Sequence, residues 1–322
     1  MTTFLITLPT RDNGGRGARA ELPGFVTDPR APFGPFDHLL NAGRAAELAA
    51  FDGALLPFDP WGEESLVAAG SLLRQSRWLR VAAGFHPGVA TPVYAAKVSA
   101  SLQRFSGDRL DWRVVVDLDP EVARAQGDFL EGADRYARAE EFLTVARGVW
   151  TQEDYSYEGR FYQVLAGGFL SPLAGRAFPR VYLSGTSPQA LELSARHADV
   201  HLFDPGDDFE GSGLRDVTYG LRLPVLVRDD DEEARRAARR LWLRGGGAED
   251  TLPEPDPDTG LWNGFPGPGL VGSHESVAAR IRDYVDRGIG AFVLEATPYV
   301  EETYRLGERL LPLLVKENAH VR

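Results

Sequence analysis

Cysteine is absent from this chain of 322 residues, and methionine occurs only once. The lack of cysteine excludes disulfide bonds, thiolate metal sites and a cysteine nucleophile. No apolar run approaches the roughly 18 residues that a membrane-spanning helix needs. The apolar run at the start of the chain is too short for the apolar core of a signal peptide. We therefore expect a cytoplasmic protein that does not enter a membrane.

Positive charge is also scarce, since 35 basic residues face 47 acidic ones and the net charge is −12. All but two of the basic residues are arginines, and they are spread along the chain without forming a basic stripe. Such a distribution argues against nucleic acid as a partner. Hydrophobic residues at 43% and charged residues at 25% are typical of a globular protein. Because we find no repeat and no linker, we expect one domain spanning residues 1–322.

Short apolar runs recur along the chain, and most are followed by a longer stretch with apolar residues at helical spacing. This alternation is typical of a parallel sheet with crossover helices, and eight such strands close a TIM (β/α)8 barrel. The eight predicted strands are Phe4 to Leu8, Gly53 to Leu56, Leu79 to Gly84, Asp111 to Val116, Val181 to Ser184, Val200 to Phe203, Tyr219 to Val227 and Ala291 to Glu295.

Eight helices are predicted between and after these strands, with three irregularities. The helices are Asp37 to Phe51, Glu63 to Leu73, Pro92 to Phe105, Asp134 to Val149, Pro188 to Arg196, Asp231 to Leu243, His274 to Arg287 and Val300 to Val315. The segment between Phe203 and Tyr219 is too short and glycine-rich for a full sixth crossover helix. Tyr155 to Val164 alternates aromatic and polar residues, as in a hairpin inserted after the fourth helix. Gly245 to Gly272 contains too many glycines and prolines for helix or strand, so we expect a mobile loop.

In barrels of this type the chemistry lies where the carboxyl ends of the strands meet. The turn from Leu183 to Pro188 runs through small residues into a helix, with Ser187 at the capping position and Pro188 at the first helical position. Free backbone N–H groups and the helix dipole make such a turn a seat for phosphate. An ordinary strand-to-helix turn needs the same small residues, and both interpretations stay open.

Two further residues near the strand ends can carry chemistry. His86 follows the third strand and could act as an acid or base, or simply be one of the polar residues that any rim presents. Arg222 lies within the seventh strand, where an arginine needs an anionic partner. That partner could be a bound anionic substrate or a carboxylate of a neighbouring strand. The remaining histidines show no ligand spacing, and we expect no metal site.

The rim residues and their flanking motifs resemble those of the bacterial luciferase-like flavin-dependent monooxygenases, and most closely the alkanesulfonate monooxygenases. The resemblance runs nearly end to end and depends on the order and spacing of many short motifs. These are Leu8 to Thr10, Asp52 to Pro57, His86 with Pro87, Ala95 to Leu102, Phe105 to Arg109, Asp134 to Tyr136, Glu158 to Tyr162, Gly185 to Ser187, Arg222, Leu270 to Gly272, Gly307 with Glu308, and Leu311 to Leu314.

This resemblance implies a monooxygenase that takes reduced FMN from a separate NAD(P)H:flavin reductase and uses O2 as co-substrate. The oxygen would reach a small, anionic alkanesulfonate through a flavin C4a-peroxide, beneath a loop that closes over the site. The resemblance also implies a homo-oligomer, a dimer or tetramer, paired through helices of the first half. The implied site residues are Gly185, Thr186, Ser187, Tyr136 and Arg135 for the cofactor, Arg11, Arg222 and Thr297 for the substrate, and Arg222, His86 and Tyr299 for catalysis.

The chain departs from the family pattern at several of the expected contact positions. Pro224, Gly132 and Thr297 replace two histidines and a tyrosine, and Arg113 and Val116 replace a flavin-facing asparagine and threonine. Each lost hydrogen bond to a buried polar ligand costs about 1 to 3 kcal/mol. Two alternatives therefore accompany the monooxygenase. One is a non-catalytic or weakly flavin-binding paralogue that acts as a partner subunit, and the other is an oxidoreductase that uses the deazaflavin F420.

Overall fold

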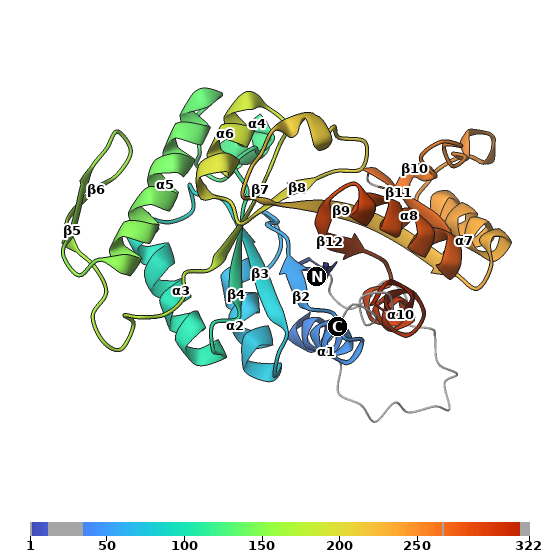
Figure 1. The fold of residues 1–322 in the computed structure, drawn as a ribbon, viewed down its shortest axis with the longest axis horizontal. Helices are drawn as coiled ribbons and strands as arrows, with labels where there is room; N and C mark the ends of the chain where they lie inside the picture. Colours follow the sequence, from blue (N-terminus) through green and yellow to red (C-terminus); the bar gives the residue numbers. More distant parts are fainter. Residues whose placement is uncertain (1, 12–34, 266, 316–322) are drawn as a thin grey trace, which may run out of the picture.

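Eight parallel strands form a closed barrel in the computed structural model, which describes residues 2–11, 35–265 and 267–315 (Figure 1). In order around the barrel they are β1 (Thr3–Thr7), β2 (Gly53–Leu56), β3 (Arg80–Phe85), β4 (Leu110–Val114), β7 (Arg180–Ser184), β8 (Val200–Phe203), β9 (Thr218–Arg228) and β12 (Ile289–Glu295). The pairings of β8 with β9 and of β12 with β1 close the ring. The predicted barrel and all eight predicted strands are confirmed.

Helices cover the outside of the barrel between the strands (Figure 1). They are α1 (Pro35–Leu48), α2 (Ser65–Gln75), α3 (Pro92–Ser106), α4 (Pro120–Ala125), α5 (Ala133–Thr151), α6 (Pro188–His197), α7 (Asp231–Arg244), α8 (His274–Asp286), α9 (Tyr299–Arg305) and α10 (Leu311–Val315). A π-helical segment, Leu306–Leu310, joins the last two, so the helix predicted there is interrupted. The short α4 was not predicted. None of the helices in the described ranges is long and apolar enough to span a membrane.

Two of the predicted irregularities, the missing sixth crossover helix and the inserted hairpin, are present. Only a short 3-10 turn, Glu210–Ser212, lies between β8 and β9, so the sixth crossover helix is missing as expected. The hairpin of β5 (Tyr155–Glu158) and β6 (Gln163–Gly167) lies outside α5, at one end of the molecule (Figure 1). The Tyr155 ring fits over Gly148 of α5 so closely that a β-carbon there would lie 2.1 Å from it.

The prediction that Gly245 to Gly272 contains no strand was wrong. This segment forms β10 (Leu261–Phe265) and β11 (Gly267–Ser273), which pair in antiparallel fashion, and β11 adds in parallel to β9 outside the barrel. The strand β9 extends beyond the barrel and offers free backbone groups there, which outweighs the poor local propensity of a glycine-rich segment. The side chain of Trp262 is 2% exposed, and its indole N–H donates to the Pro253 carbonyl at 2.7 Å. Pro266 lies outside the described residues.

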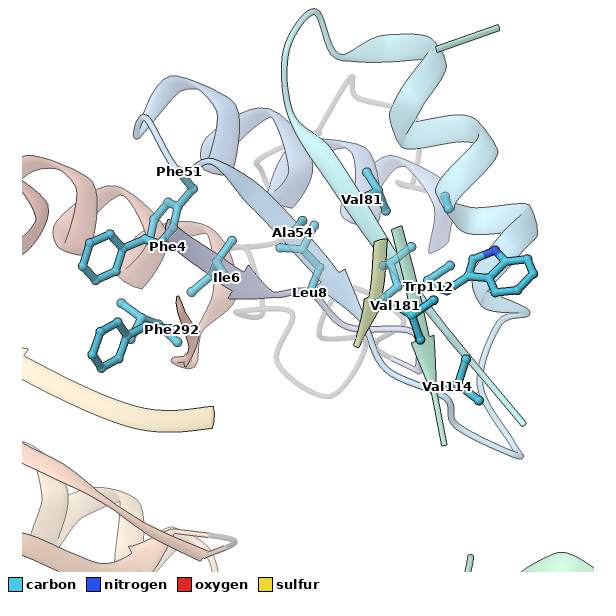
Figure 2. Close-up of a cluster of buried hydrophobic side chains, with 14 of the residues drawn as sticks. Phe4, Ile6, Leu8, Phe51, Ala54, Val81, Trp112, Val114, Val181 and Phe292 are labelled. Carbon is cyan, nitrogen blue, oxygen red and sulfur yellow. The ribbon is translucent and has the colours of Figure 1, made fainter. Parts of the chain in front are cut away.

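Alternate side chains of the strands build two layers of core. Outward-facing residues such as Ile6, Ala54 and Val81 pack beneath the helices together with Trp112, whose indole N–H donates to Ser99 Oγ at 2.8 Å (Figure 2). Inward-facing residues fill the barrel with a second apolar cluster of Leu5, Leu55, Ala82, Tyr182, Val200, Leu202, Ala291 and Val293. The barrel is therefore a packed core and not a pore.

Ionic contacts close the amino-terminal end of the barrel. Asp111 is fully buried and lies 2.5 Å from Arg80 Nη2 and 2.8 Å from Arg180 Nη2. Its two partners come from the strands on either side of β4, so the three side chains tie neighbouring strands together. In barrels of this type the chemistry lies at the opposite, carboxyl end.

Candidate functional site at the barrel mouth

Four charged side chains, here called the mouth cluster, gather at the carboxyl end of the barrel: Arg113 of β4, Asp204 after β8, Arg222 of β9 and Glu295 of β12. Arg222 binds Asp204 at two points, with Nε 2.9 Å from Oδ1 and Nη2 3.1 Å from Oδ2. Its Nε is also 3.9 Å from Glu295 Oε1. A neighbouring carboxylate, one of the two partners considered for Arg222, is therefore present, and the roles of Arg222 in substrate binding and catalysis stay predictions.

Burial changes the electrostatics of the other two members of the mouth cluster. Arg113 donates to Ser184 Oγ at 2.6 Å and to the Val114 carbonyl at 2.8 Å. Burial, together with the nearby charge of Arg222, lowers the pKa of Arg113 to about 10, although Asp204 opposes the change. Burial and the charge of Asp204 raise the pKa of Glu295 against the opposing influence of Arg222. The sequence analysis assigned no role to Glu295. A signal was nevertheless present, because alternate residues of β12, Ala291 and Val293, face the barrel interior, and Glu295 continues this series at the end of the strand.

The turn between β7 and α6 has the local geometry expected of an anion seat. Ser187 caps α6 by accepting a hydrogen bond from the Ala190 N–H at 3.2 Å. Gly185 has a φ of +109°, which favours glycine, and a β-carbon there would lie only 3.0 Å from that of Ala190. Tyr136 of α5 joins the turn, because Ser187 Oγ donates to its hydroxyl at 3.3 Å. Thr186 is exposed at the same turn.

An acid from the loop after β4 lies beside this turn. The hydroxyl of Tyr136 donates a hydrogen bond to Asp117, which follows β4. Burial and this contact raise the pKa of Tyr136 to about 12, so the phenol keeps its proton at neutral pH. The residues predicted to bind the cofactor are thus brought together, with the exception of Arg135, and a carboxylate lies beside them.

Two predicted site residues, Arg135 and His86, make their contacts with the protein itself. Arg135 is 8% exposed and donates to the carbonyls of Leu130 and Leu118, both at 2.7 Å. His86 is 1% exposed, with Nδ1 2.7 Å from the Val115 carbonyl. Its Nε2 lies 2.7 Å from Asp128 Oδ2 and 2.9 Å from Arg138 Nη2. Both residues therefore brace the loop after β4, and their proposed roles in cofactor binding and catalysis stay predictions.

The remaining predicted residues lie around the rim. Arg11 is exposed, pairs with Asp59 and stacks over the Trp61 ring at 5.3 Å. Thr297 is exposed in the turn that follows β12. Tyr299 begins α9 and packs, half-buried, against the main core. Their assignments to substrate and catalysis stay predictions. Within the described ranges, no group of three or more metal-binding side chains occurs.

Comparison with solved structures shows the same fold in several enzymes. EDTA monooxygenase from Chelativorans sp. BNC1 superimposes with a TM-score of 0.76 at 18% identity, covering 98% of this chain and 94% of that one. A riboflavin lyase superimposes with a TM-score of 0.75 at 17% identity, covering 99% of this chain and 92% of that one. The F420-dependent tetrahydromethanopterin reductase from Methanopyrus kandleri superimposes with a TM-score of 0.71 at 13% identity, covering 97% of this chain and 99% of that one. At such identities these likenesses establish the fold alone.

The sequence family gives the stronger result. Residues 2–290 match the family described as luciferase-like monooxygenase. The matched segment is most of the chain and contains seven of the eight barrel strands in full. Monooxygenases of this family use reduced flavin and O2. The chain therefore belongs to the luciferase-like monooxygenase family, and its enzyme class is that of the flavin-dependent monooxygenases.

Proposed function

We propose that this protein is a reduced-flavin-dependent oxygenase that acts on a small polar organic substrate at the barrel mouth. The observation that carries the proposal is the mouth cluster, which places two arginines and two carboxylates at the open end of a luciferase-like barrel. A reduced flavin, when bound, would react with O2 and so provide the oxygen atom for the substrate. The residues of the chain bind and orient the substrate beside it.

The contacts of Arg222 favour a substrate with hydrogen-bond donors over an alkanesulfonate. Asp204 occupies the Nε–Nη2 edge of this guanidinium and neutralises its charge, so a sulfonate would have only the remaining N–H groups, beside a carboxylate. A sulfonate would also lie near Glu295, 3.9 Å from Arg222, and that carboxylate would repel it when charged. A hydroxyl or amine can instead donate to Asp204 or Glu295 without breaking the pair. We therefore propose an alcohol- or amine-bearing substrate.

The fit of the cofactor to the β7–α6 turn is incomplete. The backbone of Gly185 and the capped start of α6 suit an oxygen-bearing ligand end. The Asp117 carboxylate, held by Tyr136 in the same turn, does not suit a phosphate. The turn thus suits a neutral, oxygen-bearing ligand end better than the phosphate group of FMN.

Anaerobic titration of the purified protein with dithionite-reduced riboflavin, FMN and F420 tests the proposal. We expect saturable quenching of protein fluorescence by at least one reduced flavin and weaker binding of its oxidised form. Oxygen uptake on addition of a flavin reductase and NADH should then rise with alcohol or amine substrates. The absence of binding by every reduced flavin overturns the proposal and favours the non-catalytic paralogue. Binding of F420 alone favours the deazaflavin oxidoreductase.

An apolar groove between α2 and α3 supports the predicted homo-oligomer. The groove encloses about 660 Å3, and Val67 and Tyr94 on its walls are 69% and 63% exposed. Apolar side chains exposed together are typical of an interface. We propose that a second copy of the chain covers this groove. Sedimentation should show a dimer or tetramer for the native protein and a smaller species for Tyr94→Glu, whereas Tyr304→Glu, on α9, should assemble normally.

A further inference from the structure

The carboxylate of Asp117 lies beside the residues to which the family resemblance assigns the flavin phosphate. It accepts a hydrogen bond from the hydroxyl of Tyr136, and its Oδ2 is 3.7 Å from the position that a β-carbon on Gly185 would take. Ser187 Oγ donates to the same hydroxyl at 3.3 Å. The donor that the family resemblance assigns to the phosphate is therefore already used by an acid of the chain itself.

The backbone on both sides of Asp117 is fixed. The Val115 carbonyl lies 2.7 Å from His86 Nδ1, and the Leu118 carbonyl accepts from Arg135 Nη1 at 2.7 Å. Both of these side chains are buried, at 1% and 8% exposure, and have further protein partners. The loop therefore cannot carry Asp117 away from the turn without breaking buried contacts, which gives His86 and Arg135 a positioning function.

The charges at this turn decide which ligand end it can accept. A phosphomonoester carries about −1.5 to −2 charges at neutral pH. The start of a helix offers the equivalent of about half a positive charge, which is less than the full negative charge of a carboxylate. A phosphate placed beside Asp117 would therefore be repelled more strongly than α6 attracts it. A hydroxyl can instead donate to this carboxylate, and its own oxygen can accept from the N–H groups of the turn.

We infer that Asp117 is a specificity-determining residue, which makes the barrel bind a flavin ending in a free hydroxyl, such as riboflavin, in preference to FMN. This inference rests on the proposed function, because it concerns the flavin that the oxygenase would use. The same repulsion acts on the polyanionic tail of F420.

Fluorescence titrations with riboflavin and FMN on the full-length protein test the inference. For the native protein we expect riboflavin to bind at least about tenfold more tightly than FMN, since repulsion acts only on the phosphate. In Asp117→Asn, and in Asp117→Ser, FMN binding should tighten until the two affinities lie within about threefold. Asp119→Asn is the matched control. It removes the same charge two residues away and keeps a side chain that can cap α4, so it should preserve the riboflavin preference.

The outcomes separate the two proposals. Equal or tighter binding of FMN by the native protein overturns the inference about Asp117 and leaves the oxygenase proposal standing. An unchanged ratio in both Asp117 variants, with circular dichroism showing that they are folded, also overturns it. If neither flavin binds the native protein or the variants in either redox state, this inference and the use of these flavins fall together.

Discussion

Arg222 of β9 and Asp204 after the neighbouring β8 form a two-point ion pair at the barrel mouth, with Nε–Oδ1 and Nη2–Oδ2 distances of 2.9 and 3.1 Å. Both side chains are about half exposed, at 48% and 52%. The pair thus lies at the solvent boundary of the proposed site, where a substrate would meet it directly. Its pairing makes Arg222 a poor receptor for a second anion while Asp204 is in place.

Removal of the counter-charge should turn Arg222 into an anion receptor. In Asp204→Asn we expect binding of 1-hexanesulfonate to tighten by about tenfold, or about 1.4 kcal/mol, because the charge of Arg222 is no longer neutralised and its Nε–Nη2 edge becomes available for a bidentate contact. Isothermal titration calorimetry measures this change. The double variant Asp204→Asn with Arg222→Gln should lose the gain. Equal sulfonate affinity in the native protein and Asp204→Asn would show that Asp204 does not restrict this arginine.

Asp128 should be a major contributor to stability beneath the loop after β4. Its carboxylate is 3% exposed and contacts Arg138 and His86, each at 2.7 Å. Asp128→Asn would leave the Arg138 guanidinium buried without a counter-charge, so the free energy of unfolding should fall by about 3 to 5 kcal/mol in urea titrations. Asp134→Asn removes an acid from an exposed pair on the same helix as Arg138, and should cost no more than about 1 kcal/mol.

The same carboxylate should give stability a dependence on acid pH. Burial alone would raise the pKa of Asp128, but hydrogen bonds from Arg138, His86 and the Leu130 N–H lower it below its usual value. A lowered pKa stabilises the fold fully above the unfolded value of about 4, and the contribution is lost as the pH falls below it. The stability difference between native protein and Asp128→Asn should therefore shrink between pH 4 and 2. A constant difference over that range would contradict this role.

Asp111 should contribute less to the free energy of unfolding than Asp128, although Asp111 is also fully buried. Its partners Arg80 and Arg180 are 30% and 38% exposed, so water can solvate them when the acid is lost. We expect Asp111→Asn to lower the free energy of unfolding by about 2 to 3 kcal/mol in chemical denaturation. Glu232→Gln, which breaks an exposed i,i+4 pair with Arg236, should change it by less than about 0.5 kcal/mol. A loss for Asp111→Asn as small as that of the control contradicts the prediction.

Gly84 of β3 allows close approach of the chain that follows β2. A β-carbon there would lie 2.4 Å from the Phe58 nitrogen and 2.7 Å from the Leu56 carbonyl, and neither backbone atom can move freely. Gly84→Ala should therefore destabilise the protein by about 1 to 3 kcal/mol, seen as a lower Tm. Gly70→Ala in α2 meets only the Leu102 side chain, 3.1 Å away, and should preserve or raise the Tm. Equal Tm values for Gly84→Ala and the native protein would contradict this prediction, because they would show that the backbone of residues 56–58 can move away from β3 at little cost.

The sequence alone determined the barrel, because strand and helix signals are local and repeat in a regular order. The predicted bounds of β2 and β8 agree with the structure, and the β7–α6 turn was identifiable because Ser187 caps α6 through the N–H of Ala190, only three residues away. Local signals failed for β10 and β11, where pairing with β9 outweighed the glycines and prolines of the segment. Strand formation there depends on a partner far along the chain.

Only the tertiary structure decided which side chains meet at the mouth. Asp117 and Tyr136 are 19 residues apart, Arg222 and Asp204 are 18 apart, and His86 and Arg138 are 52 apart. No local pattern encodes such pairs, because barrel closure brings together side chains from separate strands and helices. The sequence therefore indicated which residues form the proposed ligand site, whereas the fold placed the acids that would determine the charge of a ligand there.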